Sequence, residues 1–143
     1  MSTVIPPERI AELMAIEEQR FLDTHKASTA AFTASSKVMH EGVPMSWMAK
    51  WPGAHPVFVK EAKGAHFTDL DGHDYIDFCL GDTGSMTGHS PAATVAAVKA
   101  QIDKGITAML PSENAAIVSD LLRERFGLPL WQFTVSATDA NRH

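Results

Sequence analysis

The sequence predicts an α/β protein built in three parts. A helical arm spans residues 1–40, a loop with a small antiparallel sheet spans 41–90, and the beginning of a larger α/β domain, with an incomplete parallel sheet, spans 91–143. Three observations support this prediction. Apolar residues recur at helical spacing near the N-terminus, an Asp-Gly pair separates short strand-like runs, and the second half follows a helix–strand–helix order.

Composition limits the functions that the chain could have. It has 143 residues, 45% of them hydrophobic, so it can form a hydrophobic core. The formal net charge of -5 argues against a general nucleic-acid binder, and the single cysteine, Cys79, excludes an internal disulfide. The N-terminus lacks a secretory signal, and no stretch approaches the roughly 20 apolar residues of a membrane span. We therefore expect a soluble cytoplasmic protein without a nucleic-acid or membrane partner.

The predicted arm contains two helices. Pro6 and Pro7 suit the start of the first helix, because a missing N–H costs little at that position. One face of this helix is apolar and carries Ile10, Leu13, Met14 and Phe21. A second helix, rich in Ala and Ser, is predicted at about 28–39 and ends before Gly42. Because two short helices cannot form a core alone, we expect the arm to pack on another surface.

The middle of the chain predicts a loop followed by three strands. The loop carries Trp47, Met48 and Trp51, which either fold onto the body of the protein or line a pocket or subunit contact. An Asp-Gly turn at Asp71 and Gly72 would need positive φ at both residues, and it indicates a tight hairpin. The strand-like runs are 57–59, 66–70 and 75–78.

Two helices and a strand are predicted after residue 90. Ser90 and Pro91 are expected to cap and start a helix that Gly105 ends, and a second helix runs from Ser112 to Gly127. Residues 130–135 predict a buried strand, and a further helix starts directly after it. Because a parallel sheet needs neighbouring strands and only one is evident, we interpret the chain as the front part of a larger domain.

Two polar clusters invite functional hypotheses but also have ordinary explanations. The acidic cluster does not follow the spacing of a calcium loop, so we favour a solvated hairpin and predict no metal site. Its members are Asp69, Asp71, His73, Asp74 and Asp77. The glycine-rich run 81–89 matches no nucleotide-binding motif, and His89 could cap or orient this loop.

The strongest signal for a ligand lies where the predicted strand 130–135 meets the next helix. Free backbone N–H groups, the hydroxyls of Ser136 and Thr138, and the positive end of the helix dipole would meet there. Such a point suits a phosphate group. The alternative is that Ser136 only caps the helix.

Five segments follow one another along the chain: GAHFTDLDGHDYIDF (64–78), GSMTGHSP (84–91), AAVKAQIDKG (96–105), LPSENA (110–115) and FTVSATDANR (133–142). Together and in this order, they resemble the N-terminal part of class III aminotransferases, and in particular members like glutamate-1-semialdehyde aminomutase. The likeness extends from about Glu41 to Arg142, and the ordered set of segments is more specific than any single motif. The resemblance implies fold type I and pyridoxal 5'-phosphate (PLP) as cofactor.

The resemblance also implies site residues. The family's N-S-G-T-E-A-N loop stands here as residues 135–141, VSATDAN, so the PLP phosphate is expected on Ser136, the N–H of Ala137, and Thr138. Ala137 adds a methyl group where the family has Gly. The loop of residues 81–87 is expected on the substrate side, through Asp82, Thr83 and Gly84.

The substrate is expected to differ from that of the aminomutases. They carry a Trp where this chain has Asp82, and their substrate-carboxylate Arg has no counterpart in GVPMSWMAK (42–50). We therefore expect another amino donor, an amine or a less usual amino acid, together with a keto acceptor.

The resemblance further implies that catalytic groups are missing. The family's cofactor-linked lysine, and the acid that pairs with the pyridine nitrogen, would lie beyond His143, so no catalytic residue is predicted here. We expect a truncated chain or one piece of a split enzyme, inactive alone, that forms a homodimer or binds the missing C-terminal part. The alternatives are a non-catalytic interaction or dimerisation module and a plain anion-binding α/β domain.

Overall fold

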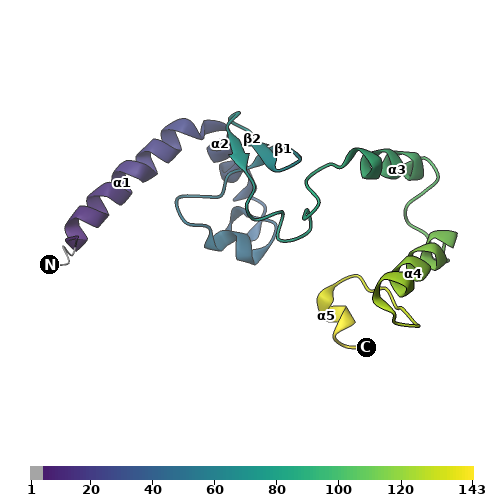
Figure 1. Cartoon of the computed structure of the whole chain (residues 1–143). Coiled ribbons are helices and arrows are strands. Elements are labelled where there is room, and N and C mark those ends of the chain that lie inside the picture. Colours follow the sequence, from purple (N-terminus) through teal and green to yellow (C-terminus); the bar gives the residue numbers. More distant parts are fainter. Residues whose placement is uncertain (1–4) are drawn as a thin grey trace. The chain divides into compact units, whose positions relative to one another are not determined.

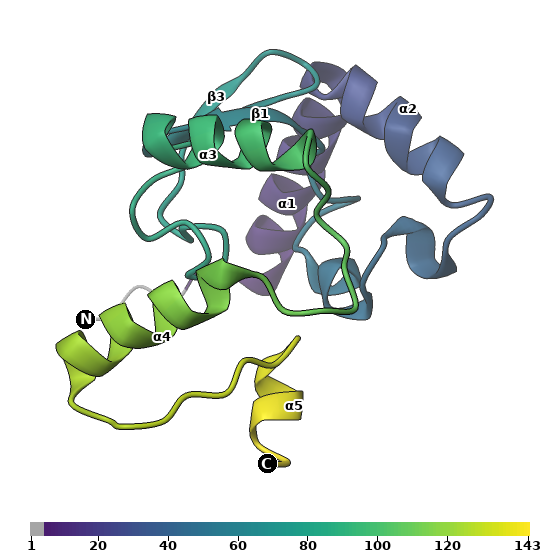
Figure 2. The same ribbon diagram turned by 90° about the vertical axis from the view of Figure 1, so that its right-hand side faces the viewer.

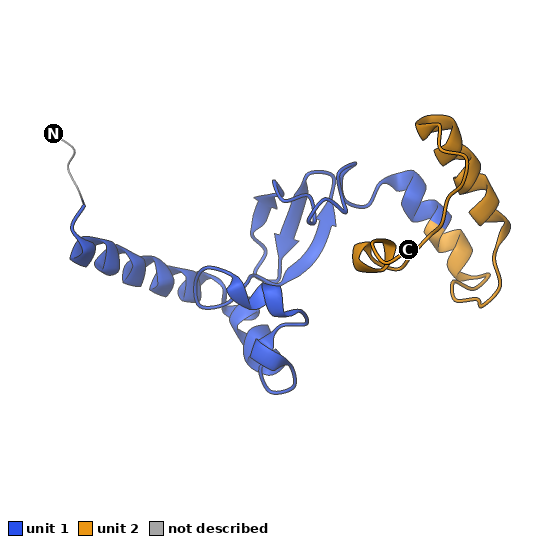
Figure 3. Cartoon of the chain, turned by 90° about the horizontal axis from the view of Figure 1, so that it is seen from below, with its two compact units in different colours: residues 1–97 blue, residues 98–143 orange. Residues whose placement is uncertain are grey.

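The computed structural model describes residues 5–143 (Figure 1), and residues 1–4 of the predicted arm lie outside this described part. The chain divides into two compact units, residues 1–97 and 98–143 (Figure 3). Helices and a three-stranded antiparallel sheet confirm the predicted mixture of α and β structure. The boundaries proposed at residues 40 and 90 stay predictions. The elements are α1 (Pro7–Thr24), α2 (Lys26–Ser35), η1 (His40–Gly42), η2 (Ser46–Lys50), β1 (Val59–Lys63), β2 (His66–Asp69), β3 (Asp74–Ile76), α3 (Ala92–Ile102), α4 (Glu113–Phe126) and α5 (Ala137–Ala140).

Helix α1 begins where the sequence predicts it to begin. Pro7 occupies its first turn, where its missing N–H costs no helical hydrogen bond. The helix ends at His25, whose backbone leaves the helical region, and the chain changes direction there before α2 (Figure 2). No residue of α1 is buried, so its apolar face, with Ile10, Leu13 and Met14, is exposed in this chain.

Helix α2 starts and ends earlier than the predicted range 28–39. At its start, the N–H groups of Ala27 and Ser28 donate to the two carboxylate oxygens of Asp71, at 2.6 and 2.9 Å. This distant carboxylate therefore satisfies two of the helix's free N–H groups. At its end the chain turns back through Gly42, whose φ is 72°. A Cβ there would lie 2.6 Å from the Phe32 ring, so the close approach needs glycine.

The predicted hairpin is present, but its turn differs from the expected Asp-Gly form. Strands β1, β2 and β3 pair antiparallel in that order, and Thr68 faces Asp74. The connection between these two residues is therefore longer than a two-residue turn. Only Gly72 has positive φ, at 89°, and Asp71 does not. The expectation for Asp71 is wrong because the connection from Thr68 to Asp74 is longer than the two-residue loop in which both central residues need positive φ.

The interior of the first unit is small and mostly polar. Its buried side chains are Ser28, Val43, His55 and Asp69. The rings of Phe21 and Phe32 lie 5.0 and 5.3 Å from the His55 ring, so aromatic contacts join α1 and α2 to the segment that precedes β1.

The helices after residue 90 follow the predicted order with one local correction. Helix α4 ends at Gly127, which has φ of 71° and donates its N–H to Arg123 O at 2.8 Å. Ser90 does not cap α3, because its φ is 51° and its hydroxyl donates to Ala62 O at 3.0 Å. The Ser90 side chain is thus directed to the sheet rather than to the helix.

The segment 130–135, which is predicted to be a buried strand, does not form one. Within the described residues this segment pairs with no strand, and Leu130 and Val135 are 88% and 97% exposed. An apolar run forms a strand only when its N–H and C=O groups find a neighbouring strand. Residues 5–143 supply no such neighbour.

Candidate functional site

A buried carboxylate organises the turn between β2 and β3. Oδ1 of Asp69 accepts from the N–H groups of Asp71 and His73, both at 2.9 Å. Oδ2 accepts from the Tyr75 hydroxyl at 2.8 Å and from Nδ1 of His73 at 3.0 Å. Asp69 is fully buried, so the expectation of a solvated hairpin is wrong for this residue. The turn folds its own donors around the carboxylate.

These hydrogen bonds determine the protonation states of Asp69 and Tyr75. Burial alone would raise the pKa of Asp69, but the His73 N–H, the Tyr75 hydroxyl and the His73 ring outweigh it and lower the pKa from 3.8 to about 2. Burial and the neighbouring Asp69 carboxylate raise the pKa of Tyr75 from 10.0 to about 12. At neutral pH Asp69 is therefore an anion that accepts, and Tyr75 a neutral hydroxyl that can donate to it.

The same network reaches the junction of α1 and α2. Nε2 of His25 lies 2.8 Å from the Tyr75 hydroxyl oxygen and 3.6 Å from Oδ2 of Asp69. The ligand atoms of His25, Asp69 and His73 lie within 4.8 Å of one another, a spacing that a cation could bridge. Each of these groups already takes part in a hydrogen bond. We therefore interpret the cluster as a structural network, and the absence of a metal site stays a prediction.

The predicted substrate-side residues lie in the loop that follows β3. Asp82, Thr83 and Gly84 are all exposed, so their groups are available to a ligand. The loop starts at Asp77, whose N–H donates to Ala65 O at 2.8 Å, and it ends at His89. The His89 side chain contacts the start of the loop, since its Nε2 lies 2.6 Å from Oδ2 of Asp77. Its capping or orienting role stays a prediction.

The predicted phosphate residues come together in one turn of the second unit. Ser136 is the N-cap of α5, and its Oγ accepts the N–H of Asp139 at 3.1 Å. The hydroxyl proton of Ser136 is still available to donate. The N–H groups of Ala137 and Thr138 belong to the first turn, where no earlier helix carbonyl can accept them. Ser136, Ala137 and Thr138 are exposed, so these donors fit an anion such as a phosphate group.

Sequence reasoning missed the two carboxylates that organise the first unit, Asp69 and Asp77. Both were placed in one acidic cluster, yet each collects donors from its own loop. The available signal was an Asp followed within a few residues by glycines, a pattern in which a carboxylate often accepts nearby backbone N–H groups. The partner histidine of Asp77 lies 12 residues away and gave no local signal.

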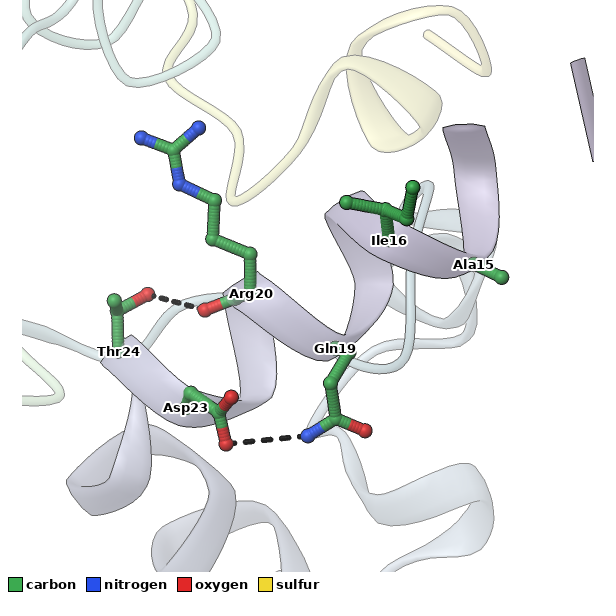
Figure 4. A pocket seen from close by; sticks show the side chains of 6 residues that line it. All are labelled: Ala15, Ile16, Gln19, Arg20, Asp23 and Thr24. Carbon is green, nitrogen blue, oxygen red and sulfur yellow. Dashed lines mark hydrogen bonds between the residues drawn. The ribbon is translucent and has the colours of Figure 1, made fainter. Parts of the chain in front are cut away.

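A hollow on α1 carries no comparable chemistry (Figure 4). It has a volume of about 510 Å³. Its polar groups pair along the helix: Gln19 Nε2 donates to Asp23 Oδ1 at 3.1 Å, and Thr24 Oγ1 donates to Arg20 O at 2.8 Å. We interpret it as a surface hollow of one helix. Among residues 5–143, no helix combines the length and the apolar character that crossing a bilayer would need.

Comparison with known proteins gives a consistent family. The family model described as aminotransferase class-III matches residues 47–142. Glutamate-1-semialdehyde 2,1-aminomutase of Thermoplasma volcanium is 38% identical over 90 residues, which cover 62% of this chain and 21% of that protein.

Solved structures of two relatives share the fold. A glutamate-1-semialdehyde aminomutase from Pseudomonas aeruginosa PAO1 is 45% identical, with a TM-score of 0.88 over 96% of this chain and 30% of its own. A variant of that enzyme was solved in complex with PMP. A β-phenylalanine aminotransferase from Variovorax paradoxus is 29% identical, with a TM-score of 0.84 over 93% of this chain and 31% of its own. The chain thus spans between a fifth and a third of the length of these relatives.

Proposed function

Because this chain belongs to the class III aminotransferases, we propose that it takes part in the PLP-dependent transfer or migration of an amino group on an amino acid or amine. The observation that carries this proposal is the family match over residues 47–142. The agreement in fold with both an aminomutase and an aminotransferase supports the same conclusion and leaves both reaction outcomes open.

In this proposal the second unit holds the phosphate of the cofactor. The hydroxyls of Ser136 and Thr138 and the N–H groups of Ala137 and Thr138 would donate to phosphate oxygens. The N-cap geometry of Ser136 supports this assignment, because Oγ accepts from Asp139 N–H and leaves its own proton free. PLP, when bound, supplies the electron sink that stabilises negative charge at the substrate carbon, while the chain supplies binding and orientation.

The catalytic lysine is proposed to lie outside this chain. A lysine that attacks a carbonyl group must be desolvated or held beside another charge. The chain's own lysines are all exposed, which supports the proposal: Lys26, Lys37, Lys50, Lys60, Lys63, Lys99 and Lys104.

We further propose a homodimer that takes an amino donor and a keto acceptor. Trp47 and Trp51 support a subunit contact near η2, because they are 53% and 50% exposed and large aromatic side chains are enriched at interfaces. Sedimentation equilibrium should give twice the 15.5 kDa of the chain, and Trp47→Ser with Trp51→Ser should shift the mass toward the monomer. A monomeric wild-type chain would contradict this part of the proposal.

Equilibrium dialysis with three probes tests the cofactor assignment. We expect the chain to bind PLP at least about tenfold more tightly than inorganic phosphate or unphosphorylated pyridoxal, a difference of about 1.4 kcal/mol. The reason is that PLP offers both a phosphate for the Ser136 turn and a ring for further contacts. Equal affinity for PLP and inorganic phosphate would instead favour a plain anion-binding domain.

A further inference from the structure

The loop after β3 contains a run of left-handed backbone. Leu80, Gly81, Asp82 and Thr83 have φ values of 54, 57, 53 and 70°. Only glycine adopts this conformation without a steric penalty, and the β-branched Thr83 is the least suited to it. Because such residues persist only where surrounding contacts determine them, other residues must hold this run in place.

Asp77 supplies the first set of those contacts. Its Oδ1 accepts from the N–H groups of Cys79 and Leu80, both at 2.9 Å, and its Oδ2 accepts from Gly81 N–H at 3.2 Å. One carboxylate thus takes three successive N–H groups at the entry to the left-handed run. The hydrogen bonds from His89 and then from these three N–H groups lower the pKa of Asp77, so its acceptor form is favoured.

His89 closes the loop from its other end. Its Nε2 lies 2.6 Å from Oδ2 of Asp77, and both side chains are mostly buried, at 19% and 10% exposure. Its backbone is tied to Gly64 by two hydrogen bonds, from Gly64 N–H to His89 O at 2.9 Å and from His89 N–H to Gly64 O at 2.8 Å. The sheet therefore fixes His89, and His89 fixes the carboxylate that gathers the start of the loop.

We infer that Asp77 and His89 are positioning residues that hold residues 80–83 in the left-handed conformation and so present Asp82, Thr83 and Gly84 to the substrate. The part of this inference that concerns the substrate rests on the proposed function. Asp82 and Thr83 are exposed, so the strained turn directs them outward while the N–H groups of Leu80 and Gly81 donate to Asp77. A relaxed loop would keep the same residues but lose their fixed placement.

Amide hydrogen exchange, followed by NMR on the full chain without cofactor, tests the holding role. We expect Asp77→Asn to speed exchange at Cys79, Leu80 and Gly81 by roughly 10- to 100-fold, as loss of charge-assisted hydrogen bonds implies. Exchange in β1 and β2 should be nearly unchanged. Asp103→Asn is the matched control, because it removes the same charge at an exposed helix end and should leave the loop unchanged.

The histidine side of the contact has its own pair of variants. His89→Ala should speed loop exchange, and His89→Gln, which keeps a side-chain N–H donor, should restore most of the protection. This pair tests the contact even where Asp77→Asn does not fold. Unchanged exchange at residues 79–81 in Asp77→Asn and His89→Ala would overturn the inference. A uniform increase across loop and sheet would also overturn it, because it would mean a general loss of stability.

The substrate part of the inference is tested by the kinetics of this chain together with the part of the enzyme that carries the catalytic lysine. Asp77→Asn should raise KM for the amino donor by about tenfold or more, with a smaller change in kcat, because the loop orients the ligand rather than the reacting atoms. An unchanged KM would overturn the substrate role. The exchange experiment needs neither PLP nor substrate, so its failure and a failure of the proposed function are distinguishable.

Discussion

Asp69→Asn is expected to lower the free energy of unfolding by about 3–5 kcal/mol, because buried donors would lose a charged acceptor and each such loss costs about 1.5–3 kcal/mol. The substitution conserves shape, but the amide nitrogen cannot accept a hydrogen bond. Four donors converge on the two oxygens of Asp69, so some of them would lose their acceptor in a buried site. Urea unfolding followed by circular dichroism measures the change.

Asp74→Asn is the matched control for this substitution. Asp74 lies on the neighbouring strand, is exposed, and accepts only the Thr68 hydroxyl at 2.6 Å among the contacts of residues 5–143. Replacing it should change the free energy of unfolding by less than about 1 kcal/mol. A similar loss in both variants would show that charge, rather than the buried network, is responsible.

Acid provides a second arm of the same experiment. The folded-state pKa of Asp69 is depressed from 3.8 to about 2. The contribution of Asp69 to the free energy of unfolding is therefore present above pH 3.8 and is lost as the pH falls through 2. Wild type should lose about 2 kcal/mol from this group over that window. Asp69→Asn should lack this part of the acid sensitivity. Identical acid titrations of stability in the two proteins would contradict the assignment.

Replacing both hydroxyls of the α5 turn, by Ser136→Ala with Thr138→Ala, is expected to weaken PLP binding by at least about 100-fold. Each hydroxyl would donate one hydrogen bond to a charged phosphate oxygen, and such bonds contribute about 1.5–3 kcal/mol each. The N–H groups of Ala137 and Thr138 remain, so some affinity should persist. Equilibrium dialysis with PLP measures the change directly and requires no catalytic activity.

Ser119→Ala is the matched control for the phosphate turn. The Ser119 hydroxyl donates to Ala115 O within α4, at 2.8 Å, so its loss removes a hydroxyl from the same unit without touching the turn. PLP affinity should be unchanged in this variant. If Ser136→Ala with Thr138→Ala binds PLP as tightly as wild type does, the phosphate assignment is wrong.

The elements that the sequence predicted well are those with a local cause. Pro7 at the start of α1 and Gly127 at the end of α4 act within their own helix turn, and both stand where expected. The segment 130–135 was predicted as a strand and is not one here, because pairing depends on partners that no local pattern reveals. The prediction that Ser90 caps a helix is wrong for the same kind of reason, because its hydroxyl donates to Ala62 O, and Ala62 is 28 residues away.

In the candidate site, too, the features with a local cause were predicted and those that depend on distant residues were not. Ser136 at the start of a helix was predicted from the local pattern, and its Oγ accepts the N–H of Asp139 as a cap does. The contacts of Asp69 and Asp77 were not predicted, because burial and the approach of His89 depend on how β3 and Gly64 bring distant residues together. A single sequence identifies a carboxylate but not the donors that surround it.

The contact between Asp71 and the start of α2 has a consequence for synthesis on the ribosome. Ala27 and Asp71 are separated by 44 residues, and the chain is made from its N-terminus. At a synthesis rate of about 5–20 residues per second, roughly 2–9 seconds pass between the synthesis of the N–H groups at the start of α2 and that of their acceptor. During that interval water must satisfy them. The helical arm therefore reaches its final form only after the turn between β2 and β3 has left the ribosome.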